Sequence, residues 1–295
     1  MSDLNEKFAE LLSGLHSGKI VPYLGPGVLA DVTDEAGEPI PADSESLIYA
    51  MNEGKPMANR LMYEFPRAAM HVELKRGRTF LTKFLSGLYG ERNWSRARFH
   101  DWLATIKPGY VIDINRDTQL QDTYADTPHT LINGVARITG TEYRFKIYHY
   151  DGSDYKEVEQ TDVDPSQPIL FKPMGCPKPD NNYIASDADY VDYITELMGG
   201  FAIPSFVKEL RKGKQYLLLG MRLNRDTERM VMSDIIYGAD EPKGWVLIPE
   251  PNKKEQRYCK RLGLEIIEAS IDDFLAATGV PSAVAASSEA SLVGC

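Results

Sequence analysis

Short, continuous apolar runs recur along the chain, and segments with helical spacing separate them. Six of these runs are interpreted as buried strands: KIVPYLG (19–25), YVIDIN (110–115), PILFKPMG (168–175), QYLLLG (215–220), GWVLIPE (244–250) and LEIIEA (264–269). Strands that are apolar on both faces are typical of a parallel sheet covered by helices on each side. The sequence therefore predicts an α/β fold, a Rossmann-like doubly wound parallel sheet.

One stretch departs from this alternation. Residues 143–150 (YRFKIYHY) alternate in polarity, and a polar turn, DGSD (151–154), follows them. We expect a small β-rich insertion over about residues 123–167, as a hairpin or a small lobe. The predicted domain spans residues 1–279, and the small, polar segment 280–295 is predicted to be a disordered tail.

Charge and composition exclude several classes of protein. The chain has 33 basic and 43 acidic side chains and a formal net charge of -10, which argues against a general binder of nucleic acid or anionic membrane. No run of about 18 apolar residues is present, and no secretory pattern opens the sequence. Three cysteines without a C-x-x-C pair argue against a four-thiolate zinc site and fit a reducing compartment. We expect a cytoplasmic protein.

The ends of the predicted strands carry the candidate ligand-binding residues. In a doubly wound sheet the ligand binds beyond the carboxyl ends of the strands, where the strand order reverses. Gly25 and Gly27 follow the first strand and could let the backbone approach a diphosphate, although Pro26 lacks an N–H to donate. Asn115 and Gly220 follow two further strands in the same way.

Several of these positions have an equally ordinary structural interpretation. Asp117 suits a helix N-cap, and Asn224 also opens a predicted helix. Lys172 near a strand end could be a surface or edge residue, and His129 could be structural. The spacing of polar residues indicates neither a Ser/His/Asp triad nor a His/Glu metal cluster.

Four strand-end motifs, in this order, resemble those of the SIR2 superfamily. They are VPYLGPGVL (21–29), VIDINRDTQL (111–120), ILFKPMGC (169–176) and LLLGMRLNRD (217–226). The family has a strand into G-A-G-x-S, later T-T/Q-N-x-D and then K-L-H-G, and its prokaryotic SIR2-like branch continues with l-G-x-s-l-x-D. The resemblance spans roughly residues 14–276 and implies a sheet that binds NAD or ADP-ribose, without the zinc module of protein deacylases.

The resemblance also implies a set of nucleotide-binding positions. They are Gly25, Gly27, Asn115, Asp117, Gly175, Gly220 and Asn224. Gly25 and Gly27 would match the phosphate loop, and Gly220 would match the glycine near the adenosine. Asn115 would match the asparagine that contacts the nicotinamide ribose or the attacking water, and it is the candidate catalytic residue of an active enzyme. Asp117 would match the aspartate that closes the same motif.

The departures from the family pattern concern catalysis. The K-L-H-G motif reads Lys172-Pro173-Met174-Gly175 here, and a methionine thioether cannot replace the proton-accepting histidine. Other departures near the same predicted pocket are Pro26, Leu29, Asp113 and Ile114. A carboxylate at position 113 is unfavourable beside a diphosphate unless a cation such as Arg116 offsets it. The hypothesis is that the pocket persists while the hydrolytic chemistry is lost or much reduced.

Three functions are compatible with the sequence. The first is a regulatory or partner-binding subunit that holds NAD or an ADP-ribose-type nucleotide, alone or as a homo-oligomer. The second is an active NAD glycohydrolase of an antiviral defence type, with His129 or Asp113 as the base. The third is a structural subunit with an empty pocket, which would use residues 143–160 and the helix 187–198, with Tyr190 and Tyr193, as contact surfaces. The alternative for these two tyrosines is ordinary packing.

Overall fold

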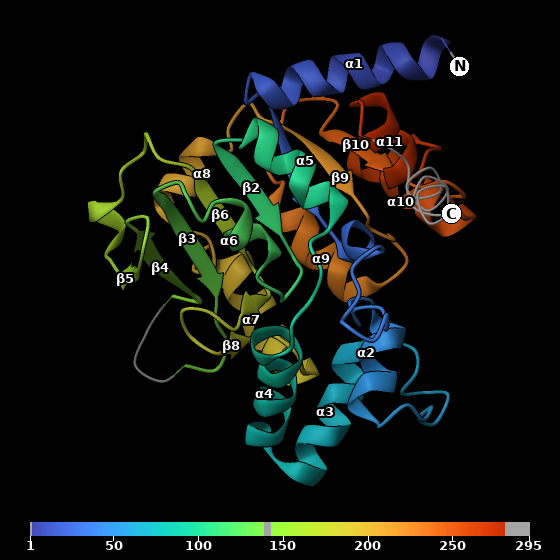
Figure 1. Cartoon of the computed structure of the whole chain (residues 1–295), viewed down its shortest axis with the longest axis vertical. Helices are drawn as coiled ribbons and strands as arrows, with labels where there is room; N and C mark the ends of the chain where they lie inside the picture. Colours follow the sequence, from blue (N-terminus) through green and yellow to red (C-terminus); the bar gives the residue numbers. More distant parts are fainter. Residues whose placement is uncertain (1, 139–142, 281–295) are drawn as a thin grey trace, which may run out of the picture.

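A single mixed sheet forms the centre of the computed structural model, which describes residues 2–138 and 143–280 (Figure 1). Within those residues the sheet has nine strands: β11 (Leu264–Ile267), β10 (Gly244–Leu247), β9 (Gln215–Leu219), β1 (Ile20–Leu24), β2 (Tyr110–Asp113), β6 (Ile169–Lys172), β3 (His129–Gly134), β4 (Phe145–Tyr150) and β5 (Tyr155–Glu157), in their order across the sheet. The first seven run parallel, and β4 and β5 are antiparallel at one edge. The prediction of a Rossmann-like, mostly parallel α/β fold is confirmed.

The predicted β-rich insertion lies at the β5 edge of this sheet. Strand β3 inserts into the parallel part beside β6, and β4 turns back along β3 as the second strand of a hairpin. Of the two expected forms, the hairpin is the one present, and it extends the main sheet instead of building a separate lobe. A short two-stranded ribbon, β7 (Gly175–Cys176) with β8 (Asn182–Tyr183), follows β6.

Helices cover both faces of the sheet. The helices α1 (Ser2–His16), α5 (Arg98–Ile106), α6 (Gln119–Thr123) and α11 (Ile271–Ala277) share one hydrophobic core, and α7 (Asp187–Gly199), α8 (Ser205–Leu210), α9 (Asp226–Ile235) and α10 (Lys253–Leu262) share the other. Alternate residues of each central strand supply the two cores, so that Leu24 of β1 packs into the first and Tyr23 into the second. This explains why the strands are apolar throughout.

Three further helices lie beyond the carboxyl ends of the strands. They are α2 (Ser44–Met51), α3 (Phe65–Arg76) and α4 (Arg78–Ser86), which Figure 1 shows below the sheet. Two short helical turns flank this region, η1 (Pro26–Leu29) directly after β1 and η2 (Gly87–Glu91) after α4, and a third, η3 (Gln160–Asp162), follows β5 at the edge of the sheet. This helical layer covers the edge at which a doubly wound sheet binds its ligand.

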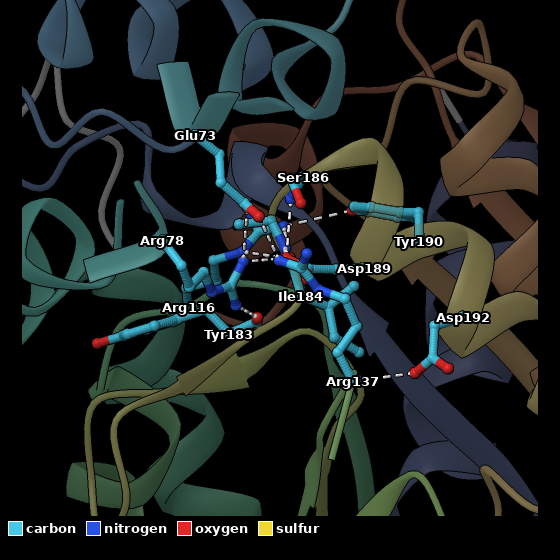
Figure 2. A network of polar contacts seen from close by, with 11 residues as sticks. Glu73, Arg78, Arg116, Arg137, Tyr183, Ile184, Ser186, Asp189, Tyr190 and Asp192 are labelled. Atoms are coloured by element: carbon cyan, nitrogen blue, oxygen red, sulfur yellow. Dashed lines mark hydrogen bonds and ion pairs between the residues drawn. The ribbon is translucent and has the colours of Figure 1, made fainter. Parts of the chain in front are cut away.

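A network of charged side chains fastens α3 and α4 to the start of α7 (Figure 2). Asp189, fully buried in the first turn of α7, accepts hydrogen bonds from the backbone N–H groups of Ala185 (3.0 Å) and Ser186 (2.9 Å). The same carboxylate forms ion pairs with Arg78 and, at 2.8 Å, with Arg137. Glu73 of α3 pairs with the same two arginines, at 3.3 Å and 2.6 Å, so the network fixes α3, α4 and the start of α7 relative to one another.

The topological switch point lies between β1 and β9. From β1 the chain moves to β2 on one side, and it later returns to place β9 on the other side. In the register of these two strands Leu24 lies beside Leu219, so that Gly25 and Gly220 leave the sheet as neighbours. Two strand ends that are almost 200 residues apart in sequence thus form one edge of the same crevice.

The two tyrosines proposed as contact residues of the helix 187–198 are part of the core. Tyr193 is fully buried and Tyr190 is only 6% exposed, so that both pack against the sheet and the contact interpretation is wrong for these side chains. The exposed apolar residues of the same helix are Val191 and Met198.

The remaining expectations concern the membrane and the end of the chain. No helix in residues 2–138 and 143–280 combines the length and the apolar character needed to cross a bilayer. The predicted tail, 280–295, lies outside the described residues from position 281 onward.

Candidate functional site

A cavity of about 920 Å³ opens at the switch point. Its wall comes from the turn η1, the segment 39–46, the loop between β9 and α9, the end of β10 and the start of α11. Ligand-binding pockets generally measure about 300–1,000 Å³. Of the predicted site residues, Gly27, Gly220 and Asn224 line this cavity.

The glycines allow the loops after β1 and β9 to touch. Gly220 has a φ of +70°, and a Cβ there would lie 2.5 Å from the backbone nitrogen of Val28 and 2.8 Å from the Cα of Gly27. The amides of Gly25 and Gly27 donate to the carbonyls of Leu219 and Gly220, each at 2.8 Å. These two N–H groups are therefore already engaged in joining the two segments. Side chains would have to supply most of the positive charge around a bound anion.

Three arginines line the cavity, and they differ in what they already bind. Arg222 forms an ion pair with the fully buried Glu255 at 2.9 Å, and Arg98 pairs with Asp31 and Asp272. Arg225 at the start of α9 has no ion pair within residues 2–138 and 143–280, and its guanidinium lies 4.5 Å from the ring centre of Tyr63. Arg225 is thus the cation best placed to meet an anionic ligand.

A buried ion pair lies behind the cavity, in the sheet itself. Because Ile112 of β2 lies beside Phe171 of β6, the next residues, Asp113 and Lys172, face each other at 2.6 Å, and both side chains are fully buried. Burial raises the pKa of Asp113 to about 6, although the Lys172 ammonium lowers it. Burial lowers the pKa of Lys172, but Asp113 and Asp117 outweigh this effect and hold it above its ordinary value.

This pair corrects two expectations. Lys172 is not a surface or edge residue, and it is the cation that offsets Asp113. Arg116 faces elsewhere, because its guanidinium donates to the carbonyl of Ile184 at 2.6 Å and to the hydroxyl of Tyr190 at 3.3 Å.

Asn115 connects the ion pair to the glycine turn. Its backbone N–H donates to Asp113 at 2.9 Å, and its side-chain amide donates to the carbonyl of Gly25 at 3.1 Å. Asn115 is 5% exposed and lies behind the wall of the cavity, together with Gly25. In this conformation Asn115 can affect a ligand only indirectly, by holding the turn after β1 in position.

Two predicted site residues lie apart from the cavity. Asp117 accepts from the backbone N–H of Gln119 at 2.7 Å at the start of α6, as a capping side chain does. Gly175 lies in the β7–β8 ribbon, paired with Tyr183. The fold therefore places Gly27, Gly220 and Asn224 together, with Gly25 and Asn115 directly behind them.

The two alternative bases, His129 and Asp113, do not reach the cavity. His129 begins β3, and its ring nitrogens lie 2.8 Å from the carbonyl of Thr127 and 2.8 Å from the hydroxyl of Tyr155. Asp113 is committed to Lys172 and to Asn115. Neither is among the residues that line this cavity.

Met174 faces a second, smaller cavity of about 30 Å³. The two cavities share the lining residues Pro26, Ala42, Ser44 and Glu228, so that they adjoin. Met174 is 3% exposed and belongs to the hydrophobic core that contains α7 and α9. The position that matches the histidine of the SIR2 motif therefore lines the smaller cavity, with an apolar side chain in place of a base.

Glu228 is the residue of this site that the sequence did not reveal. It lies in the first turn of α9, where an acidic residue is ordinary because it interacts favourably with the helix dipole. Only the tertiary structure shows that Glu228 lines both cavities. Burial, together with the carboxylate of Glu64, raises its pKa to about 7.

His100 on α5 gives a testable pH dependence. It is fully buried, neither ring nitrogen has a hydrogen-bond partner among the described residues, and burial lowers its pKa well below the ordinary value. Below about pH 6.5 the histidine binds a proton in the unfolded chain but not in the folded one. The free energy of unfolding therefore falls by up to about 1.4 kcal/mol for each unit by which the pH is lowered. Urea unfolding of a His100→Leu variant between pH 7.5 and 5.5 is expected to show a shallower dependence.

The control for this experiment is the exposed His16. A His16→Leu variant is expected to keep the pH dependence of the unaltered protein. An identical dependence for His100→Leu and the unaltered protein would contradict the assignment.

Within the described parts of the chain, no group of three or more His, Cys, Asp or Glu side chains is arranged to hold a metal ion. Cys176 and Cys259 are both buried and free.

Comparison with known proteins assigns the family. The model of the SIR2-like domain matches residues 111–267, which is more than half of the chain and extends from β2 through β11. A comparison with curated proteins gives no match. The matched region includes Lys172, Met174, Gly220 and Glu228. The chain belongs to the family of SIR2-like domains.

Proposed function

We propose that the cavity between β1 and β9 binds NAD or a nucleotide of the ADP-ribose type. The observation that carries this proposal is the position of a cavity of about 920 Å³ at the switch point of the sheet. Arg225 lines this cavity and forms no ion pair with any other described residue. Open α/β sheets bind nucleotides at this place. Membership of the SIR2-like family suggests an NAD-related function.

The residues present suit such a ligand. A diphosphate needs positive charge, and Arg225 can supply it beside the turn that contains Gly27. An adenosine needs an apolar surface with a few polar groups, and the wall beyond Gly220 combines Leu247 and Pro249 with Asn224. These residues would hold the two parts of one extended nucleotide.

The same proposal assigns the protein a regulatory or partner-binding role. The family's histidine is replaced by Met174, which lies in an apolar environment and cannot accept a proton. Turnover in this site therefore needs a different base. Without efficient turnover, the bound nucleotide would act by regulating a contact with a protein partner or with a second copy of the chain.

Isothermal calorimetry with ADP-ribose and with NAD tests the binding proposal. We expect saturable binding to one site, and an Arg225→Ala variant is expected to bind at least about tenfold more weakly, because a hydrogen bond between charged groups contributes about 1.5–3 kcal/mol. The loss should shrink as salt concentration rises.

Arg257 provides the matched control, because it is an exposed arginine on α10 outside the cavity wall. Arg257→Ala is expected to bind as the unaltered protein does. If millimolar ADP-ribose and NAD produce no binding heat at several temperatures, the proposal fails.

A further inference from the structure

We infer that the outer surface of α3, α7 and α9, called here the three-helix face, is the interface of a symmetrical dimer of this chain. In this dimer α3 of each copy packs on α7 of the other. The inference gives the partner contact of the proposed function a place and an occupant, and it does not depend on nucleotide binding. Two observations carry it: a gathering of exposed apolar side chains on three adjoining helices, and the opposite charges of α3 and α7.

The large apolar side chains that stay exposed on helices lie on the three-helix face. Leu74 of α3 is 75% exposed, Val191 and Met198 of α7 are 68% and 72% exposed, and Met230 of α9 is also exposed. Within residues 2–138 and 143–280 no other helix has an exposed large apolar side chain. Because α7 packs against both α3 and α9, these side chains belong to adjoining helices. Single exposed apolar residues are ordinary, whereas a gathering of them marks a contact site.

The apolar stripe on α7 reaches the end of the helix. Val191 and Met198 are seven residues apart, so they lie on one side of α7 about two turns apart, with the exposed, uncharged Thr195 between them. The helix ends in a left-handed glycine turn, after which the N–H of Phe201 donates to the carbonyl of Glu196 at 2.7 Å. This bond folds the chain back on the last turn of α7 and keeps the exposed ring of Phe201 close to it.

The ion-pair network at the start of α7 holds the three-helix face in one arrangement (Figure 2). Asp189 of α7 pairs with Arg78 and Arg137, and Glu73 of α3 pairs with the same two arginines. Glu73 directly precedes the exposed Leu74, so the network fixes this part of α3 against α7. A surface that is rigid before binding loses less conformational entropy when a partner docks.

The charges of α3 and α7 are opposite. Helix α7 contains four acidic residues and no Lys, Arg or His, whereas α3 contains three Lys or Arg and a single acid, Glu73, which is committed to the network. Arg67 and Lys75 of α3 are exposed and form no ion pair among the described residues. On α7, Asp187 and Glu196 are partly exposed. The three-helix face therefore has a basic helix beside an acidic one.

Such a face is complementary to a copy of itself. Rotation by a half turn about an axis that runs between α3 and α7 places α3 of each copy on α7 of the other, so the opposite charges meet twice. Helix α7 has 13 residues and is therefore about 20 Å long. With a neighbour on each side, at about 10 Å per helix, the face covers about 600 Å². This is close to the roughly 800 Å² that each partner of a stable complex buries.

Sedimentation velocity at about 1–100 µM protein, without nucleotide, tests the inference. The unaltered protein is expected to reach twice the mass of the single chain. Val191→Glu/Met198→Glu is expected to weaken the dimer at least about 100-fold, because each copy would bury two unpaired carboxylates. Both positions are exposed in the single chain, so the thermal unfolding midpoint should stay unchanged.

The matched control adds the same charge elsewhere. Ser13→Glu/Gln256→Glu alters exposed positions on α1 and α10, and it is expected to dimerise as the unaltered protein does.

A pair of charge-reversed variants tests which helices meet. Arg67→Glu/Lys75→Glu reverses the exposed charges of α3, and Asp187→Lys/Glu196→Lys reverses those of α7. Each variant alone should dimerise at least about tenfold more weakly, because like charges then face each other. An equimolar mixture is expected to restore dimers that contain one copy of each variant, since both contacts again join opposite charges. Native mass spectrometry identifies these mixed dimers.

Three results would overturn the inference. The first is a single-chain mass up to about 100 µM, which would leave the three-helix face to a partner of different sequence. The second is a dimer that Val191→Glu/Met198→Glu does not weaken. The third is a mixture of the charge-reversed variants that associates no better than either variant alone, and this result stands even if the apolar variant fails to fold. Calorimetry of nucleotide binding is independent of all three, so the two proposals fail separately.

Discussion

Replacing Lys172 with methionine is expected to lower the free energy of unfolding by about 3–5 kcal/mol, because removal of one partner leaves the other charge buried and unpaired. Lys172 and Asp113 are both fully buried, and their side chains meet at 2.6 Å between two central strands. The carboxylate also accepts the backbone N–H of Asn115, so a disturbed Asp113 would loosen the turn behind the cavity. Urea unfolding at pH 7.5 measures the change.

A double variant supplies the control for this prediction. In Asp113→Asn/Lys172→Met the second charge is removed while an oxygen remains for the Asn115 N–H, so the double variant should be more stable than Lys172→Met alone. By contrast, Glu209→Gln breaks an exposed ion pair with Lys212 and should change stability by less than about 1 kcal/mol. A Lys172→Met variant as stable as Glu209→Gln would show that the buried ion pair does not hold the two strands together.

Replacing Gly220 with alanine is expected to damage both the fold and the site. The backbone conformation at φ +70° costs a residue with a Cβ about 1–2 kcal/mol. The added Cβ also meets the backbone of Gly27 and Val28, and forced shifts of packed backbone cost about 1–3 kcal/mol more. Because the two loops must separate, ADP-ribose affinity should fall at least about tenfold.

Gly18 isolates the steric part of that effect. It has a φ of +68°, and a Cβ at this position has no atom within 4 Å. Gly18→Ala should therefore show the conformational cost alone and leave ligand affinity unchanged. Equal unfolding midpoints and equal affinities for the two variants would show that contact between the loops after β1 and β9 is unimportant.

The fold could be predicted because its signal is local. Each central strand is apolar on both faces, as Ile20–Leu24 shows, and two separate hydrophobic cores explain that pattern. The order of the strand-end motifs then indicated the family. The partners of the strands are not local: β3 joins the parallel sheet beside β6, although the sequence around it looks like an inserted hairpin. Pairing depends on long-range packing that periodicity does not encode.

The site was predictable where backbone geometry decides and not where side chains meet from distant segments. Gly27 and Gly220 follow strands and line the cavity, as a strand-end argument predicts. Lys172 gave no sign of its burial, because only the register of β2 against β6 brings it to Asp113. Glu228 resembled an ordinary first-turn acid, since its neighbours Glu64 and Arg116 come from remote parts of the chain.

We propose that a nucleotide binds at the switch point between β1 and β9, and a crystal structure of the protein with saturating ADP-ribose tests this site. We expect ligand density across the wall formed by Gly27 and Gly220, with the diphosphate near Arg225. Ligand bound elsewhere on the molecule, with this cavity empty at saturation, would show that the switch point is not the nucleotide site.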